Sequence, residues 1–366
     1  MSALKDVYSE GFYRQFCNAV AKVYPEFNSK KFIKNIFTEE FQQMELKQRI
    51  RHTTLVLHEF FPKNFKDDAI LIEKIIDQIE SEDIKYDRFP FLFFPDYIEI
   101  YGINDFEIAI PILERTTQFI TCEYAVRPFI LKYPEKMLAQ MLKWSKHKNH
   151  HVRRLASEGS RSRLPWAMAL PFLKKNPEPI FGILENLKND ESEYVRRSVA
   201  NNLNDIAKDN PDVTLAIAKK WLGKTKETDA LVKHGCRTLL KQGHPEVLSQ
   251  YGLLSENILV ENFKIETPKV SVPKAIIFSF SVKNNYETPQ IIRLEYAIYF
   301  NKANGQLSKK VFKISERNYS ASQLEQVVKK HSFKLITTRK YYPGLHQVSV
   351  IVNGSEKAIG SFTLEN

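Results

Sequence analysis

Apolar residues recur every three or four positions through most of residues 1–258. The pattern is clear in two stretches: Phe12, Phe16 and Val20, then Leu71, Ile75 and Ile79. This spacing puts the apolar side chains on one face of a helix, so it predicts a series of amphipathic helices. Prolines between the periodic stretches predict helix boundaries, among them Pro111, Pro134, Pro171 and Pro211. We therefore predict a helical domain over residues 1–258.

One helical segment occurs twice. Residues 151–158 (HVRRLASE) reappear 43 positions later as residues 194–201 (YVRRSVAN). A third, weaker copy at residues 231–240 (LVKHGCRTLL) follows the second after 37 positions. Repeats of this length are typical of two-helix solenoids, in which equivalent helices stack and equivalent residues face the same partner.

The periodicity changes from helical to two after residue 260. Alternating apolar positions form several short runs: 276–282, 292–300, 348–352 and 362–364. Turn signals separate these runs: Asn284-Asn285, Asn304-Gly305, Pro343-Gly344 and Asn353-Gly354. About seven short strands indicate a small immunoglobulin-like β-sandwich over residues 260–366. Residues 320–330 are compatible with a helical turn or a loop.

Composition indicates a globular protein of a reducing compartment. Of the 366 residues 43% are hydrophobic, and the three cysteines (Cys17, Cys122 and Cys236) are widely spaced and odd in number. That usage argues against a disulfide framework and a zinc site. No run of about 18 apolar residues occurs, and the first residues lack signal-peptide features. We expect a cytoplasmic protein without membrane association.

The charge of +11 is unevenly distributed. Residues 1–139 hold 18 Lys and Arg against 22 Asp and Glu, whereas residues 140–259 hold 20 against 13. Residues 260–366 hold 16 against 8. A basic region of this kind fits a polyanion, with nucleic acid as the leading candidate, although a merely soluble basic surface is the alternative.

The first copy of the repeated segment carries charged residues beside its apolar stripe. On a helix, Arg154, Glu158 and Arg161 stand at i, i+4 and i+7. The residues predicted to be buried are Val152, Leu155 and Ala156. A carboxylate flanked by arginines on a solenoid face suggests a binding surface that also has chemical activity.

The second copy repeats this arrangement with a carboxylate one turn further on. Arg197, Asn201 and Asp205 share the corresponding face, and the residues predicted to pack inward are Val199, Leu203 and Ile206. In the third copy the corresponding positions are His234, Thr238 and Gln242, so the carboxylate is absent there.

A third carboxylate precedes the two copies. Residues 119–127 are predicted to be a helix that pairs Glu123 with Arg127 four residues on. Glu123, Glu158 and Asp205 are separated by 35 and 47 residues, about one repeat each. Since packed helices lie about 8–10 Å apart, the three carboxylates are predicted to converge along one groove. The alternative is that each Arg–Glu pair is an ordinary solvated ion pair.

A basic segment ending in an aromatic residue follows the first copy. Arg161 and Arg163 precede Trp166, a combination suited to phosphate contact and stacking on a base or sugar. The alternative is a tryptophan packed between repeats beneath an arginine. The adjacent His150 and His151 point in different directions on a helix, so we expect no metal.

These motifs resemble the AlkC branch of the HEAT-like-repeat alkylbase DNA glycosylases. The resemblance covers residues 153–161 with Leu164-Pro165-Trp166, residues 194–205, residues 339–346 and residues 352–354. It implies a mainly α architecture, an α-α superhelix of HEAT-like repeats, followed by the immunoglobulin-like domain. In that family the repeats hold DNA in a basic concavity and the second domain supports a bent duplex.

The resemblance implies hydrolytic excision of cationic alkylated bases, such as N3-methyladenine and N3-methylcytosine, from duplex DNA without full base flipping. Asp205 is the strongest catalytic match, with Glu158 and Glu123 beside it. The residues expected to contact DNA are Arg154, Arg161, Arg163, Trp166, Arg197, Lys233, Arg339 and Lys340. No cofactor is expected, and the absence of an evident catalytic lysine predicts a monofunctional glycosylase without lyase activity.

Two other functions remain open at this point. A non-catalytic HEAT-repeat binder of bent or damaged DNA would share the basic surface but would need no carboxylates facing its ligand. A protein-interaction scaffold is the commonest role of such arrays. The expected partner is duplex DNA containing alkylated bases, bound by a monomer in a bacterial-type cytosol near the nucleoid. The β-sandwich either contacts the DNA backbone or only caps the last repeat.

Overall fold

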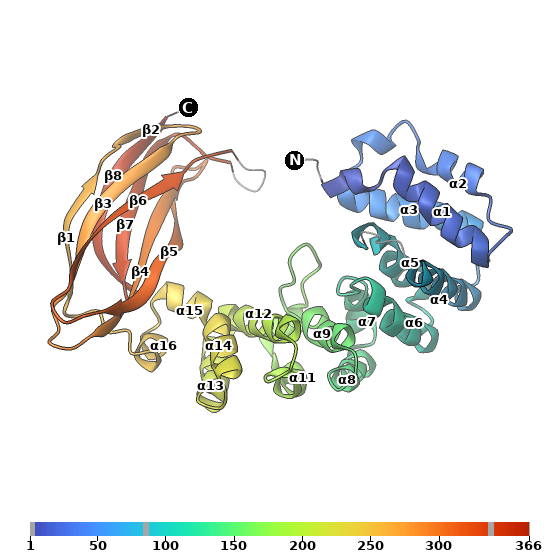
Figure 1. Ribbon diagram of the computed structural model, residues 1–366, viewed down its shortest axis with the longest axis horizontal. Coiled ribbons are helices and arrows are strands. Elements are labelled where there is room, and N and C mark those ends of the chain that lie inside the picture. Colours follow the sequence, from blue (N-terminus) through green and yellow to red (C-terminus); the bar gives the residue numbers. More distant parts are fainter. Residues whose placement is uncertain (1–3, 83–87, 336–339, 366) are drawn as a thin grey trace. The chain divides into compact units, whose positions relative to one another are not determined.

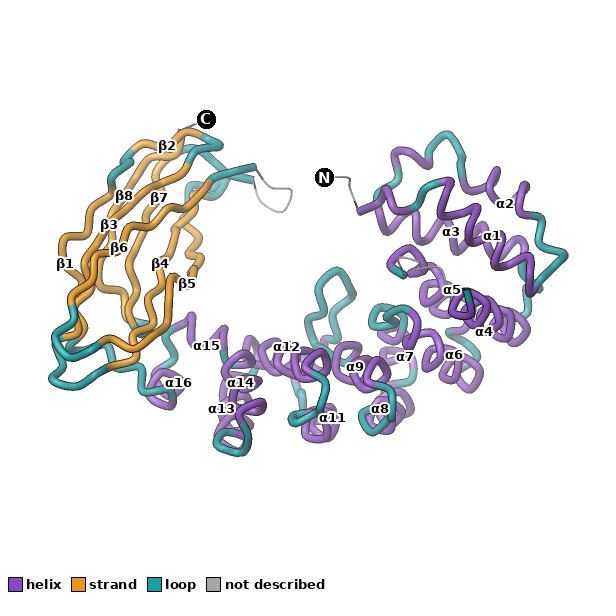
Figure 2. The backbone as a smooth tube through the Cα atoms, viewed as in Figure 1, coloured by secondary structure: helices purple, strands orange, loops and turns teal. Residues whose placement is uncertain are grey.

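The computed structural model describes residues 4–82, 88–335 and 340–365 (Figure 1). Contacts divide the chain into two compact units, Met1–Gly235 and Cys236–Asn366. Within the described residues the first unit consists of helices, and the second combines two short helices with eight strands (Figure 2). The predicted fold class, a helical-repeat region followed by an immunoglobulin-like sandwich, is confirmed.

The helices of the first unit follow one another with short connections. They are α1 (Glu10–Val23), α2 (Ser29–Ile36), α3 (Leu46–Phe60), α4 (Phe65–Ser81), α5 (Phe93–Gly102), α6 (Phe106–Phe119), α7 (Val126–Lys132), α8 (Pro134–Trp144), α9 (His150–Gly159), α10 (Pro171–Lys175), α11 (Phe181–Leu187), α12 (Glu193–Asp209), α13 (Pro211–Trp221) and α14 (Lys226–Gly235). Four 3-10 turns lie among them: η1 (Leu4–Val7), η2 (Phe41–Gln43), η3 (Phe89–Leu92) and η4 (Glu178–Ile180). None of these described helices is both long and apolar enough to cross a membrane.

Prolines mark helix starts as predicted, with one exception. Pro134, Pro171 and Pro211 are the first residues of α8, α10 and α13, where a missing N–H costs no hydrogen bond. Pro111 was predicted to be a boundary, but it lies inside α6. Buried residues on both sides, among them Ala109 and Leu113, keep α6 continuous by packing.

The helices of the first unit stack in two layers. The repeated helices α9 and α12 contact each other, and α12 contacts α14 in turn. The intervening helices α8, α11 and α13 form the second layer and pack against the first (Figure 1). The residues predicted to be buried are all in the core: Val152, Leu155, Ala156, Val199, Leu203 and Ile206.

The third copy of the segment is not one helix. Helix α14 ends at Gly235 and the next helix begins at Arg237, so Thr238 and Gln242 do not continue the face that carries His234. A Cβ atom on Gly235 would lie 2.6 Å from Cδ2 of Leu203. The close approach of α14 to α12 therefore requires glycine at this position.

The second unit begins with α15 (Arg237–Gln242) and α16 (Pro245–Gln250). Its strands are β1 (Ile258–Ile265), β2 (Lys269–Ser271), β3 (Ala275–Asn284), β4 (Gln290–Asn301), β5 (Leu307–Tyr319), β6 (Leu324–Ser332), β7 (Gly344–Val352) and β8 (Ser355–Glu365). They form a three-stranded sheet, β1-β3-β6, and a five-stranded sheet, β2-β8-β7-β4-β5. Apolar side chains of both sheets fill the space between them, as the alternation predicted.

Strand β6 replaces the helical turn or loop considered for residues 320–330. It pairs with β3 over its whole length, from Ala275 opposite Ser332 to Lys283 opposite Leu324. Its exposed and half-buried positions alternate. The polar sequence QVVKKHS hid this alternation, because even the half-buried positions include the polar residues Lys329 and His331.

Helices α15 and α16 pack against the sandwich. A Cβ atom on Gly243 would lie 2.7 Å from the carbonyl oxygen of Gly354, and Asn353 donates a hydrogen bond to the carbonyl of Leu254. The predicted boundary between residues 258 and 260 lies at the start of β1, which follows the end of α16 at Gln250 after a short connection. The contacts, however, group everything from Cys236 onward together.

Candidate functional site

The three predicted carboxylates come from three different elements. Glu158 lies in the last turn of α9 and Asp205 lies in α12. Glu123 was predicted to lie on a helix, but it occupies the turn between α6 and α7. Helix α7 begins only at Val126 because Pro128 must lie in a first turn, where its missing N–H leaves no bond unmade.

Two arginines join these carboxylates into one chain of ion pairs. Nη1 of Arg154 lies 2.6 Å from Oε2 of Glu123, and its Nη2 lies 3.7 Å from Oε1 of Glu158. Nη1 of Arg161 lies 2.6 Å from the same Glu158 oxygen, and its Nε lies 2.7 Å from Oδ2 of Asp205. We call these five residues the carboxylate–arginine network. The predicted convergence of the carboxylates is therefore present in the structure.

The network is buried rather than solvated. Glu123 is 8% exposed, Glu158 is 5% exposed and Asp205 is 1% exposed. Ser198 donates a hydrogen bond to Oε2 of Glu158 over 2.7 Å, and Lys208 donates one to Oδ1 of Asp205 over 2.8 Å. The alternative of an ordinary solvated ion pair does not describe these residues, because a buried charge is retained only with such partners.

Burial and charge act in opposite directions on Glu123. Removal from water raises the pKa of its carboxyl group, and the Arg154 guanidinium opposes that rise. Glu158 adds a smaller rise by charge repulsion. The protonation of Glu123 therefore depends on the position of Arg154.

Arg161 reaches the network from a loop, not from the helix on which it was predicted. Helix α9 ends at Gly159, two residues before it. A Cβ atom on Gly159 would lie 2.5 Å from Cγ2 of Val126, so the chain packs tightly here and turns away. The prediction that Arg161 stands on the same helix, seven residues after Arg154, was wrong, although Arg161 still contacts Glu158.

Arg127 shapes this loop and does not pair with Glu123. Its guanidinium donates hydrogen bonds to the backbone carbonyls of Gly159, Arg161 and Met168 at 2.9, 2.7 and 2.7 Å. A cation is favourable at the C-terminus of α9, where the carbonyls lack helical partners. Burial lowers the pKa of Arg127 to about 10, with the charge of Arg161 acting in the same direction and Asp205 and Glu158 opposing it.

Trp166 is presented to solvent by the same loop. Its side chain is 66% exposed, so it is not packed beneath an arginine. Its φ is +63°, a conformation that bulky residues adopt at a cost. Its carbonyl accepts a hydrogen bond from Lys47 of α3. An exposed aromatic held in a strained loop is available for stacking, and its role in DNA binding stays a prediction.

The remaining predicted DNA contacts are not members of the network. Arg163 forms a bidentate pair with Asp209, with distances of 2.6 and 2.7 Å. Arg197 is exposed and pairs with Glu193 on its own helix. Lys233 lies on α14, and Lys340 lies in the second unit 5.4 Å from the ring of Tyr342. Arg339 lies outside the described residues.

Two tyrosines beside the network were missed. The guanidinium carbon of Arg154 lies 4.8 Å from the centre of the Tyr194 ring. Tyr124 is near enough that Glu123, Arg154 and Glu158 influence its pKa, although burial is the main cause of the rise in that pKa. Tyr194 begins the second copy of the repeat, and its position there was the available signal. Tyr124 has no motif, and only its proximity to Glu123 marks it.

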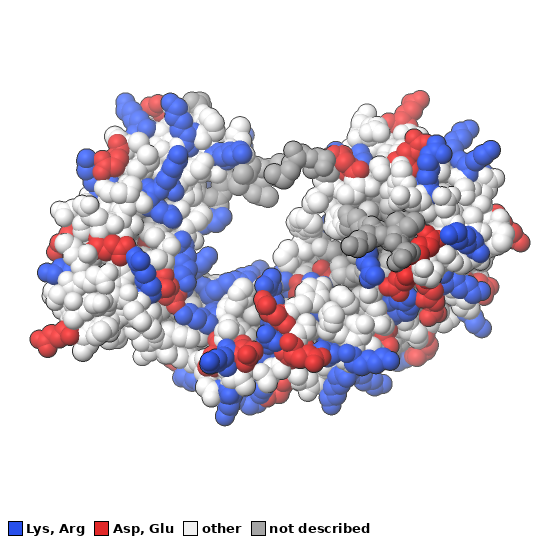
Figure 3. Space-filling view, in the orientation of Figure 1, with Lys and Arg blue, Asp and Glu red and all other residues white. Residues whose placement is uncertain are grey.

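The surface carries both signs of charge. Figure 3 shows Lys and Arg interspersed with Asp and Glu on the drawn face of the first unit, with Lys and Arg predominating in the second. Within the described residues no cluster of three or more His, Cys, Asp or Glu has a metal-binding arrangement. His150 and His151 have their ring centres 4.2 Å apart, beside Tyr194.

Comparisons with known proteins agree with the motif resemblance. Residues 114–240 match the family model described as DNA alkylation repair enzyme, and residues 259–366 match that of the uncharacterised protein YhaZ, C-terminal Ig-like domain. The uncharacterized protein YhaZ of Bacillus subtilis is 41% identical over 358 residues, covering 98% of both chains. The Pseudomonas fluorescens alkylpurine DNA glycosylase AlkC, solved bound to DNA containing an abasic site analog, is 32% identical over the whole of both chains, with a TM-score of 0.92.

Proposed function

Because this chain belongs to the AlkC-type family of DNA alkylation repair enzymes, we propose that it is a DNA glycosylase acting on cationic alkylated bases in duplex DNA. The substrates we expect are N3-methyladenine and N3-methylcytosine. The reaction is hydrolysis of the N-glycosidic bond, which releases the modified base and leaves an abasic site.

The chemistry requires little acid catalysis. An N3-alkylated base already carries a positive charge, so it leaves as a neutral molecule without being protonated. Positive charge then develops on the deoxyribose, as it does on the sugar in glycoside hydrolysis. A carboxylate held near that sugar in a site that excludes bulk water stabilises the developing charge and positions the one attacking water.

The observation that carries this proposal is the convergence of Glu123, Glu158 and Asp205 in one buried network. These carboxylates come from a turn and two helices separated by up to 82 residues, and two shared arginines fix their mutual positions. A set of fixed charges requires little reorganisation when the reaction occurs. We assign Asp205 as the principal catalytic residue, with Glu158 and Glu123 completing the electrostatic environment.

The arginines have a structural part in this proposal. Arg154 and Arg161 contact the carboxylates and are themselves largely buried. In the proposed complex their remaining N–H groups and the positive charge of the loop attract the DNA backbone. Arg163, Trp166, Arg197 and Lys233 extend the proposed contact in the first unit, and Lys340 with Arg339 extends it in the second.

A lysine lies closer to Asp205 than the sequence suggested. Nζ of Lys208 is 2.8 Å from Oδ1 of Asp205, so this lysine forms an ion pair with the proposed catalytic carboxylate. We retain the monofunctional assignment. Incubation with abasic DNA and borohydride is expected to trap no covalent complex. A trapped complex that Lys208→Arg abolishes would overturn it.

The test of the proposed function is release of bases from methylated duplex DNA. The purified protein is incubated in chelator with duplex carrying N3-methyladenine, and the free base is quantified by mass spectrometry. Release in the presence of chelator is expected. If no base is released but the duplex is bound with a steep salt dependence, the chain is a damage-sensing binder. Salt-insensitive binding of a protein with no DNA affinity would identify a scaffold.

The expectations of a monomer and of a cytoplasmic protein near the nucleoid belong to the same proposal. A DNA-binding solenoid presents one continuous surface, so a second copy is not needed to complete the site. A mass in solution equal to the 42.7 kDa of one chain, independent of protein concentration, would support the monomer.

A further inference from the structure

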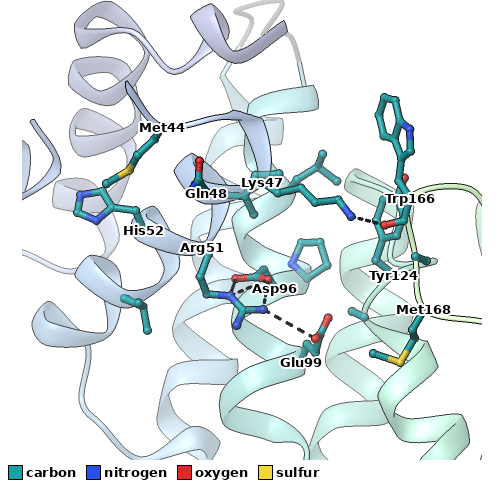
Figure 4. A pocket seen from close by; sticks show the side chains of 16 residues that line it. Met44, Lys47, Gln48, Arg51, His52, Asp96, Glu99, Tyr124, Trp166 and Met168 are labelled. Carbon is teal, nitrogen blue, oxygen red and sulfur yellow. Dashed lines mark hydrogen bonds and ion pairs between the residues drawn. The ribbon is translucent and has the colours of Figure 1, made fainter. Parts of the chain in front are cut away.

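A cavity of about 620 Å³ lies within the first unit (Figure 4). Its walls come from α3, α5, the turn that follows Glu123, and the loop that carries Trp166. The volume is in the range of small-molecule sites. The walls from α3 and α5 precede residues 114–240, the segment that matches the DNA alkylation repair family model.

The cavity adjoins the carboxylate–arginine network. Glu123 belongs to the network, and the next two residues, Tyr124 and Ala125, line the cavity. Arg127 anchors the loop that supplies Trp166, Ala167 and Met168 to the same cavity. The same turn and the same loop therefore build both sites, so a molecule leaving the network has the cavity beside it.

The residues that line the cavity are mainly apolar and include a tyrosine and a tryptophan. The apolar and aromatic lining residues are Met44, Ile50, Leu55, Leu92, Pro95, Tyr124, Ala125, Trp166, Ala167 and Met168. Aromatic and thioether side chains pack well against the faces of flat rings. A planar heterocycle gains more binding free energy from contact with such walls than a flexible or strongly hydrated ligand does.

Both lysine and arginine in the cavity already have partners. Arg51 makes a bidentate pair with Asp96, with Nε and Nη2 each 2.9 Å from a carboxylate oxygen. Lys47 donates a hydrogen bond to the carbonyl of Trp166 (Figure 4). An anionic ligand such as a phosphate would have to displace these contacts.

Glu99 is the carboxylate with the weakest pairing in the cavity. Its Oε1 lies 3.9 Å from Nη2 of Arg51, beyond hydrogen-bonding distance. Burial, with the charge of Asp96 acting in the same direction and Arg51 and Lys47 opposing, raises the pKa of Glu99 to about 7. An acceptor of this kind suits a ligand that brings N–H donors.

We propose that this cavity binds a free nucleobase with an exocyclic amino group, stacked against the apolar walls and donating to Glu99. Such a base is the class of product that the proposed reaction releases from methylated adenine or cytosine, so the inference rests on the proposed function. The cavity retains the base after excision, and its release becomes a separate step.

Direct binding to the DNA-free protein tests this. Ligand-detected nuclear magnetic resonance with 3-methyladenine, adenine and hypoxanthine measures the affinities. Hypoxanthine has the same shape as adenine but carries a carbonyl in place of the amino group, which a carboxylate repels. Adenine is expected to bind about tenfold more tightly than hypoxanthine or better, the effect of one hydrogen bond to a charged group. No binding of adenine or 3-methyladenine at millimolar concentration overturns the proposal.

Two variants with matched controls locate the bound base. Leu55→Trp narrows the cavity and is expected to weaken adenine binding about tenfold or more, as loss of a well-packed ring contact does. Ile70→Trp alters a similarly exposed residue of α4 outside the cavity and should have no effect on adenine binding.

The glutamine side chain of Glu99→Gln cannot ionise, so the affinity of this variant for adenine should not change between about pH 6 and 8. The affinity of the unaltered protein should rise with pH as Glu99 ionises. Glu73→Gln on α4 is the matched control. Binding that neither cavity variant alters overturns the proposal.

A second arm distinguishes a free base from a base still attached to DNA. Duplexes with and without one unpaired adenine nucleotide are titrated with both tryptophan variants. If Leu55→Trp lowers only the affinity for the duplex with the unpaired adenine and leaves the affinity for free adenine unchanged, the assignment to a released product is wrong. Excision measured on the same preparations keeps the two proposals separate. If the protein excises the base but binds no free base, the proposed function stands and the proposed binding site is wrong. If it binds the free base but does not excise, the binding site stands and the proposed function is wrong.

Discussion

Each unit contains a buried network of arginine and carboxylates, and the two networks differ in construction. In the second unit, Arg293 pairs with Glu295 at 2.6 Å and with Glu316 at 2.9 Å. Arg293 and Glu316 face each other across the paired strands β4 and β5. One hairpin therefore supplies the whole network, and among the described residues Nε of Arg293 and Oε2 of Glu295 have no hydrogen-bond partner.

The network of the first unit draws on a turn, a helix end, a loop and a neighbouring helix. The partly exposed residues Tyr194 and Lys208 contact it, the loop of Arg161 also carries the exposed Trp166, and a cavity adjoins it. Buried ion pairs alone are weak evidence of function. The comparison shows that assembly across repeats, beside exposed aromatic residues and a cavity, distinguishes the candidate site from a structural ion pair.

The largest expected effect on stability comes from removing the central cation of the second network. Arg293→Met leaves Glu295 buried without a compensating charge, so the second unit should lose about 3–5 kcal/mol of stability. The denaturant midpoint of this unit, followed by the fluorescence of its tyrosines, measures the change. Lys309→Met, at an exposed position of the same sheet, should shift the midpoint little. An unchanged midpoint in Arg293→Met would show that the second network is not structural.

Removing Arg154 should affect pH dependence in addition to stability. Burial raises the pKa of Glu123 and Arg154 opposes that rise, so Arg154→Met raises the pKa further. If ionised Glu123 is required, activity is lost as pH falls through this pKa. The acid limb of the rate profile should then move to higher pH by about one unit or more. Arg197→Met, at the equivalent position of the second repeat, should leave the limb in place. A limb that stays fixed in Arg154→Met would contradict the role of Glu123.

Trp166 gives the smallest expected effect. Trp166→Ala removes an exposed ring, so the free energy of unfolding should change little, whereas affinity for methylated duplex should fall by about 1–3 kcal/mol. Fluorescence anisotropy with labelled duplex measures the affinity, and Trp166→Phe should retain most of it. Equal affinity of Trp166→Ala and the unaltered protein would remove Trp166 from the proposed interface.

The repeat predicted more of the site than the helix assignments did. A period of 43 residues was sufficient to place Glu158 and Asp205 on neighbouring helices, because solenoid helices of equivalent position pack side by side. Glu123 and Arg161 were assigned to helices that do not extend so far. Pro128 delays α7, and the close packing at Gly159 ends α9. The proline is a local signal within the sequence, whereas the packing at Gly159 depends on contacts with segments distant in the sequence.

Other features had no local signal. Arg127 appeared to pair with Glu123 by spacing, but three backbone carbonyls of a distant loop bind it instead. The cavity joins α3 and α5 to the loop of Trp166, and no motif connects those segments. Strand β6 was missed because alternation with polar residues on both sides resembles a loop. Local periodicity identifies elements, whereas sites formed between elements require the tertiary contacts.

One comparison of variants tests the central claim most directly: single-turnover excision of N3-methyladenine by Asp205→Asn and by Asp209→Asn. Both residues lie on α12 and both pair with an arginine of the same loop, but only Asp205 belongs to the carboxylate–arginine network. The account predicts that Asp205→Asn loses about 10²–10³ in rate while still binding duplex, and that Asp209→Asn remains near the unaltered rate. Excision at the unaltered rate by folded Asp205→Asn would contradict it.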